Sequence, residues 1–206
     1  MLRKRLHNQD RQRLVLVFVL WGGLLEICLA APRALILYDG PSAGYSEGMI
    51  SSNSIANLLG HFSVTFTIQP LEAYKKGSLQ DYDWTFFAGN VEKTRIPGDY
   101  LEDVVAASKP VFWLNRHINQ LTVFPGFRQK FGFSFVDYRD DEDFDEVIYR
   151  GISLRKTDPD LNLIRIENFS QCRVWAQVKN RAGLQPYIIQ SGSLWYVADS
   201  PFSYVE

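Results

Sequence analysis

Three side chains of this sequence, Asp39, Glu47 and His117, could carry out acid–base chemistry together. Asp39 and His117 each follow an apolar run that reads as a strand, and Glu47 lies near the start of the segment after Asp39. In a parallel sheet, ligands bind beyond the carboxyl ends of the strands, and these ends meet at one edge. Two carboxylates and an imidazole at that edge could hydrolyse a bond by general acid–base catalysis. The sequence therefore offers these three as candidate catalytic residues of a hydrolase.

Asn90 and Asn115 follow two further apolar runs and would lie at the same edge. Asn and Asp residues after strands are also the usual residues of turns and helix caps. That ordinary role accounts for Asp39, Asn90 and Asn115 about as well as catalysis does. A sheet edge without catalysis is thus the competing hypothesis.

The sequence predicts no cofactor and no metal. Residues 40–44 form a glycine-containing turn that lacks the spacing of a dinucleotide fingerprint or a phosphate loop. Neither His-x-x-x-His nor Cys-x-x-Cys occurs, so no zinc site is indicated. Asp141, Asp143 and Asp145 alternate as in a calcium loop, but the glycine and the final glutamate of an EF-hand are missing. A solvated acidic loop is the better interpretation.

The amino-terminal segment has the pattern of an export signal. Basic residues precede an apolar run at 14–25, and small residues at Cys28 and Ala30 favour cleavage after Ala30. We therefore expect a signal peptide at 1–30, one α/β domain at 31–206, and a periplasmic or extracellular location. The alternative is an uncleaved anchor, because residues 14–31 approach the length of a short membrane span.

Charge and cysteine content narrow the partners and the means of stabilisation. The formal net charge of -1 disfavours nucleic acid and anionic membrane surfaces, which select basic proteins. After cleavage only Cys172 would remain, so no intramolecular disulfide can form. Cys172 lies in an apolar strand pattern, which favours a buried small side chain over a nucleophile.

Strands and helices alternate in the amino-terminal half of the chain, as in right-handed crossover units. The first strand carries four consecutive apolar residues, which is typical of a strand buried on both faces. This pattern predicts a parallel sheet of about four strands. The predicted strands are 34–38, 62–68, 84–88 and 110–114, and the predicted helices are 46–60 and 97–108.

Beyond residue 121 the pattern changes to short strands without long helices, apart from a short helix or loop at 124–131. These strands should form antiparallel hairpins that extend the parallel sheet. The predicted fold is a flavodoxin-like or class I glutamine-amidotransferase-like three-layer α/β sandwich. The predicted strands are 133–138, 147–150, 161–166, 173–178, 186–189 and 193–198.

Residues 88–92 are the place where amidotransferase-like sheets carry their nucleophile, on a sharp turn after the third strand. Here they read Ala-Gly-Asn-Val-Glu and contain neither Cys nor Ser. Acyl transfer needs a nucleophile within reach of a base. We therefore expect a tight turn rather than a catalytic elbow.

The run from Trp195 to Tyr204, the Leu-Tyr-Asp-Gly at 37–40, the strand ending near Gly89 and the strand with Asn115 resemble an uncharacterised family. Its members are exported bacterial polysaccharide-deacetylase-like proteins, and the resemblance covers their leading domain. In that family a deacetylase barrel follows this domain and would hold the metal ligands. No catalytic residue can be carried over to this chain.

The resemblance implies a non-catalytic accessory or scaffold domain of an exported polysaccharide deacetylase-like protein, without the deacetylase domain that would follow it. Its partners would then be a polysaccharide or a deacetylase domain, and it would meet a membrane only through an uncleaved signal segment. Two other hypotheses stay open. One is the hydrolase of Asp39, Glu47 and His117, and the other is a carbohydrate-binding module with exposed, coplanar aromatic rings.

Overall fold

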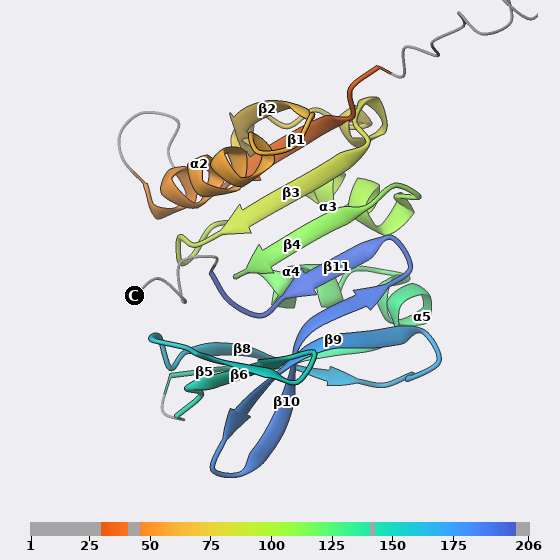
Figure 1. The fold of residues 1–206 in the computed structure, drawn as a ribbon. Helices are drawn as coiled ribbons and strands as arrows, with labels where there is room; N and C mark the ends of the chain where they lie inside the picture. Colours follow the sequence, from red (N-terminus) through yellow and green to blue (C-terminus); the bar gives the residue numbers. More distant parts are fainter. Residues whose placement is uncertain (1–29, 41–45, 141–142, 201–206) are drawn as a thin grey trace, which may run out of the picture. The chain divides into compact units, whose positions relative to one another are not determined.

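A nine-stranded mixed sheet organises this computed structural model, which describes residues 30–40, 46–140 and 143–200 (Figure 1). The chain divides into Met1–Ala31 and a unit from Pro32 onward that contains the whole sheet. The predictions for the signal segment, the 41–44 part of the first turn and Asp141 lie outside the described residues. In sheet order the strands are β2 (Thr65–Pro70), β1 (Arg33–Tyr38), β3 (Trp84–Gly89), β4 (Val111–Asn115), β11 (Leu194–Val197), β10 (Gly183–Ser191), β9 (Cys172–Asn180), β6 (Glu146–Tyr149) and β7 (Ile152–Arg155).

The first five strands of this order, β2, β1, β3, β4 and β11, run parallel to one another. After β1 the chain steps outward to β2 and then returns past β1 to β3, so the strand order reverses between β1 and β3. This is the crossover at which open α/β sheets bind ligands. The predicted mixed α/β fold with a parallel sheet is confirmed.

β11 corrects one part of the sequence prediction. Its residues were expected in an antiparallel hairpin, yet they pair in parallel with β4 and antiparallel with β10. β11 is therefore a fifth parallel strand and joins the two halves of the sheet. Beyond it, β10, β9, β6 and β7 are antiparallel, as expected for this half.

A separate two-stranded sheet of β5 (Phe133–Arg139) and β8 (Leu161–Ile166) was not predicted as such. The sequence pattern placed both segments as extensions of the main sheet. Instead they pair with each other, because their apolar side chains bury against the main core. Phe133, Ile164 and Ile166 are members of that core.

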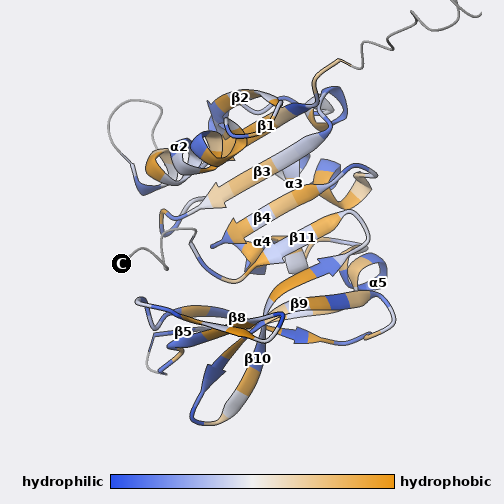
Figure 2. Ribbon diagram, viewed as in Figure 1, coloured by the Kyte–Doolittle hydropathy of each residue, from blue (hydrophilic) through white to orange (hydrophobic). Residues whose placement is uncertain are grey.

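The alternation of side chains along β1 explains why the sheet has a hydrophobic core on each face. Ala34 and Ile36 pack in one hydrophobic core, while Leu35 and Leu37 pack in another. Successive residues of a strand point to opposite faces, so the two cores lie on the two faces of the sheet. Figure 2 shows hydrophobic residues along β1 and β4, which agrees with strands covered on both sides.

Helices cover both faces. α2 (Glu47–Leu59) packs in the core that contains Ala34, and α3 (Gly98–Ala106), α4 (Ile118–Thr122) and α5 (Phe127–Phe131) contribute to the other. As predicted, α2 begins after Ser46, whose hydroxyl accepts the N–H of Met49 at 3.2 Å, and ends before Gly60. Short 3-10 turns at Leu71–Ala73 and Ser78–Asp81 complete the second crossover. Among the described residues no helix has the length and apolar character to cross a lipid bilayer.

Cys172 is 7% exposed, and its thiol donates to the carbonyl oxygen of Phe131 at 3.0 Å. Burial raises the pKa of this thiol, which keeps it protonated and unreactive. In a Cys28→Ser variant Cys172 is the remaining thiol of the sequence. We expect Ellman's reagent at pH 8 to label it at least tenfold more slowly in the folded protein than in concentrated guanidinium chloride. Equal rates would contradict the buried assignment.

Candidate functional site

Asp39 follows β1 directly and is 1% exposed, at the carboxyl edge of the sheet. Its carboxylate accepts the backbone N–H of Asn90, at 2.9 Å and 3.0 Å to the two oxygens, and that of Val91 at 2.8 Å. Nε2 of His117 lies 2.9 Å from the same carboxylate. Asp39 thus ties the end of β1 to the turns after β3 and β4.

The hydrogen bonds of His117 fix its tautomer. Nδ1 lies 3.4 Å from the side-chain nitrogen of Gln120, which can only donate, so Nδ1 accepts. Nε2 therefore carries the hydrogen and donates to Asp39. Gln120 in turn donates to the carbonyl of Thr94 at 2.7 Å and accepts the N–H of Ile96 at 3.0 Å. Both ring nitrogens of this buried imidazole therefore have partners inside the protein.

The backbone N–H groups of Asn90 and Val91 occupy the turn after β3. Such N–H groups stabilise the negative oxygen of a reacting acyl group when they point at empty space. Here the carboxylate of Asp39 already accepts both. Together with Asn90 in place of a nucleophile, this arrangement opposes acyl transfer at the turn.

A chain of polar side chains crosses the same edge. The amide of Asn90 donates to the hydroxyl of Ser51 on α2 at 2.8 Å and accepts from Asn115 at 3.1 Å. Asn115 in turn accepts from Asn162 on β8 at 2.8 Å. The sequence pointed to Asn90 and Asn115 but missed Ser51 and Asn162. One sequence feature could have pointed to Ser51, because a run of Ser and Asn residues is unusual inside a helix.

Glu47, the third candidate, does not join Asp39 and His117. It is exposed on the first turn of α2 and lines a cleft that the other two residues do not line. The structure therefore brings two of the three candidate catalytic residues together and places the third elsewhere along the edge.

The cleft beside Glu47, called here the crossover cleft, has a volume of about 300 Å³. Its walls come from α2, from the turns after β3 and β4, from the segment after β7, and from Ser200 beyond the end of β11. These are carboxyl ends of strands on both sides of the reversal between β1 and β3, where such folds bind ligands. Its lining residues are Glu47, Ile50, Ser51, Asn90, Asn115, Arg116, Thr157, Asp158 and Ser200.

A buried ion pair holds one wall of the crossover cleft. The ammonium of Lys156 lies 2.7 Å from the carboxylate of Asp199, with side-chain exposures of 0% and 4%. The same ammonium donates to the carbonyl oxygens of Asp158 and Asp160. Removing one partner of such a pair leaves a buried charge uncompensated. The pair fixes the segment that carries Thr157 and Asp158, and the sequence analysis did not identify it.

The turn after β4 is strained. Asn115 and His117 both have positive φ angles, 64° and 68°, which side chains with a Cβ rarely adopt. Each such residue costs about 1–3 kcal/mol, and such residues gather at functional sites. This backbone brings the side chain of Asn115 to the cleft and that of His117 to Asp39.

Four aromatic rings form a row across the sheet. Phe86 stacks on Phe112, Phe112 on Trp195, and Trp195 on Trp175, with centroids 4.6, 5.7 and 5.4 Å apart. The guanidinium of Arg173 lies 3.9 Å from the centroid of Trp175. Rings stacked in this way use their faces on one another, and a sugar would need an open face. The row therefore does not supply the platform that a module binding sugars by stacking requires.

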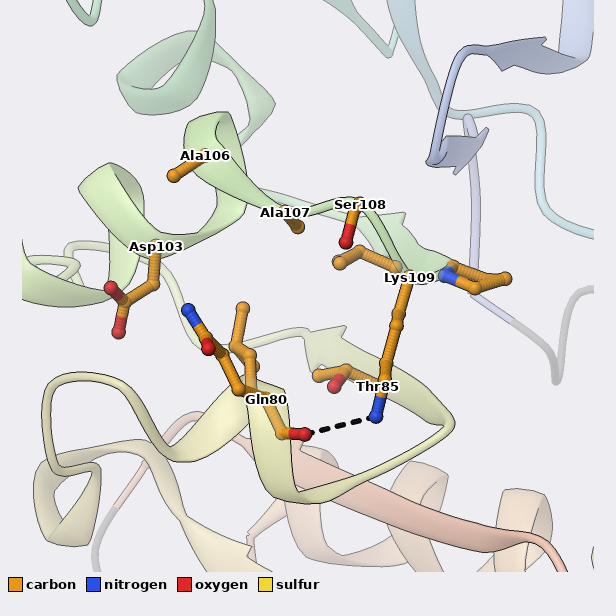
Figure 3. A pocket seen from close by; sticks show the side chains of 10 residues that line it. Gln80, Thr85, Asp103, Ala106, Ala107, Ser108 and Lys109 are labelled. Carbon is orange, nitrogen blue, oxygen red and sulfur yellow. Dashed lines mark hydrogen bonds between the residues drawn. The ribbon is translucent and has the colours of Figure 1, made fainter.

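A second cavity, of about 190 Å³, lies near the amino ends of β3 and β4 (Figure 3). Lys109 donates there to the carbonyl of Gln80 at 2.9 Å, and the carboxylate of Asp103 accepts from Tyr74 and from the backbone N–H of Gly77. The chain itself thus uses these polar groups. In the described ranges, His, Cys, Asp and Glu residues form no group of three suited to a metal ion.

Comparisons with known proteins give the fold. No family model matches the chain, and no curated protein matches it. A solved ThuA-like protein of Bacteroides uniformis superposes with a TM-score of 0.60 at 12% identity, over 86% of each chain. A second ThuA-like protein, from Parabacteroides merdae, has a TM-score of 0.45 at 11% identity, over 81% of this chain and 78% of that one.

An exo-beta-1,4-mannosidase of Opitutaceae bacterium strain TAV5 has a TM-score of 0.51 at 10% identity. The match covers 89% of this chain but only 34% of the mannosidase. The fold of the chain is amidotransferase-like, and it matches that of the solved ThuA-like protein of Bacteroides uniformis. At these identities the likeness concerns the fold alone.

Proposed function

We propose that this chain is a non-catalytic accessory domain of an exported polysaccharide-modifying protein. The observation that carries the proposal is the position of Asp39. Its buried carboxylate accepts from the N–H groups of Asn90 and Val91 and from His117, so the groups that could have served catalysis hold the fold together. The crossover cleft then serves as a polar site for binding.

Two further points support the link to polysaccharides. The mannosidase is a precedent, because a fold of this kind makes up about one third of that glycan-active enzyme. From the sequence resemblance we infer that the catalytic partner is a deacetylase. From the amino-terminal segment we infer that the chain is exported before it assembles with that partner. The deacetylase would act on the polysaccharide, and this domain would help to hold it.

Acetate release distinguishes the accessory domain from the hydrolase alternative. We expect the purified protein to sediment with insoluble acetylated xylan or chitin, and to release acetate from them, or from p-nitrophenyl acetate, no faster than buffer does. A positioned general base would contribute about 10²–10⁴-fold in rate. Acetate release that His117→Gln abolishes, in a variant shown to be folded by circular dichroism, would overturn the proposal in favour of the hydrolase.

A further inference from the structure

The floor of the crossover cleft presents amide donors held in place by buried contacts. Ser51 and Asn90 are 1% and 8% exposed, and both line the cleft. Among the described contacts, Asn90 donates one amide hydrogen to Ser51, and Asn115 donates one to Asn90. A side-chain amide has two N–H donors, so Asn90 and Asn115, which both line the cleft, each keep a second N–H beyond these contacts.

The rim of the cleft presents acceptors. Glu47 is exposed at the start of α2, and Asp158 lies on the segment fixed by Lys156. One oxygen of Asp158 accepts the backbone N–H of Asp160 at 2.9 Å, which orients the carboxylate. A hydroxyl group both donates and accepts a hydrogen bond. Donors on the floor and acceptors on the rim therefore match a ligand that carries several hydroxyl groups.

Arg116 is held beside these groups rather than left free to capture an anion. Its guanidinium lies 3.3 Å from the carboxylate of Glu92 and 4.8 Å from the ring centroid of Tyr138. Glu47 and Asp158 add two negative charges to the cleft, so a ligand carboxylate would meet net repulsion there. The balance of charge favours a neutral ligand over a uronate.

From this arrangement we infer that the crossover cleft binds a neutral polyhydroxylated ligand, namely one or two uncharged sugar units of a glycan. The inference rests on the proposed function and specifies its site and its ligand class. The donors are the amides of Asn90 and Asn115, and the acceptors are the carboxylates of Glu47 and Asp158. Ile50, which is 44% exposed at the cleft, can contact the apolar face of a sugar ring.

The test uses cellobiose, β-1,4-mannobiose and N,N′-diacetylchitobiose as neutral probes, with digalacturonate as the charged comparison. We expect at least one neutral disaccharide to shift the side-chain amide signals of Asn90 and Asn115 in ¹H–¹⁵N spectra of the whole protein. Asn162 is the internal control, because both of its amide hydrogens already have acceptors, on Asn115 and Ala198, and it does not line the cleft.

Rim variants locate the site without disturbing the core. Glu47→Gln and Asp158→Asn should each weaken binding of the neutral disaccharide about tenfold, since each replaces a charged acceptor. Asp99→Asn is the matched control, because Asp99 is likewise exposed in the first turn of a helix, α3. It should leave the affinity unchanged.

The outcomes separate this inference from the proposed function. Disaccharide binding that neither rim variant weakens, or stronger binding of digalacturonate than of every neutral probe, overturns the cleft assignment and leaves the accessory role intact. The cleft assignment is likewise overturned, and the accessory role left intact, if the protein sediments with polysaccharide but binds no disaccharide at disaccharide concentrations of tens of millimolar. Acetate release lost in His117→Gln overturns the accessory role instead.

Discussion

Asp39→Ala is expected to lower the free energy of unfolding by about 3–5 kcal/mol, because it leaves three donors without an acceptor, two of them on buried residues. These donors are the backbone N–H groups of Asn90 and Val91 and the ring N–H of His117. An unsatisfied buried donor costs about 1–3 kcal/mol. Denaturation by urea, followed by tryptophan fluorescence and by circular dichroism, measures the difference between the variant and the original protein.

Asp83→Ala is the control for this prediction. The carboxylate of Asp83 also accepts a backbone N–H, that of Arg33 at 2.9 Å, but its side chain is 53% exposed. Water can replace it there, so the loss should stay below about 1 kcal/mol. If the two variants lost equal stability, the structural role assigned to Asp39 would be wrong, and its availability for chemistry would have to be reconsidered.

The parts of the fold that the sequence predicted are those that neighbouring residues determine. The apolar run at 34–37 is a strand buried on both faces because each of its side chains must find a core. The limits of α2 follow from Ser46 as the N-cap and Gly60 after the last turn. Such signals are local, and they do not depend on what packs against them.

The pairing partners of the later strands could not be predicted in the same way. β11 and β5 both read as ordinary apolar strands, yet β11 joins β4 in parallel and β5 leaves the main sheet. A strand pattern states that a segment has a buried face but does not identify its neighbour. The neighbour is chosen by packing over long sequence separations.

The candidate site also combines features that local sequence predicts with features that it does not. The sequence placed Asp39 and His117 at one edge, but their roles depend on the backbone N–H groups of Asn90 and Val91 and on Gln120. Backbone donors are present at almost every residue and leave no mark in the residue types. The residue types of Asp39 and His117 fit a catalytic role, whereas the hydrogen bonds around the carboxylate of Asp39 favour a structural one.

Gly48→Ala is expected to destabilise the protein by about 3 kcal/mol, even though Ala favours helices over Gly by about 1 kcal/mol. A Cβ at this position of α2 would lie 2.3 Å from the backbone oxygen of Asp39 and 2.6 Å from its carboxylate. Neither atom can give way, because the first belongs to the backbone directly after β1 and the second accepts the N–H of Asn90 at 3.0 Å. α2 would have to move away from the sheet.

Gly98→Ala separates this close contact from the general preference of helices for Ala. Gly98 is the first residue of α3, and a Cβ there would meet nothing within 4 Å. That variant should match the original protein or exceed it by up to about 1 kcal/mol in urea denaturation. Because α2 also carries Glu47 and Ser51, Gly48→Ala should weaken disaccharide binding at the crossover cleft, and Gly98→Ala should not. Equal stability of the two variants would show that α2 does not approach β1 this closely, and the floor of the cleft would then lose its basis.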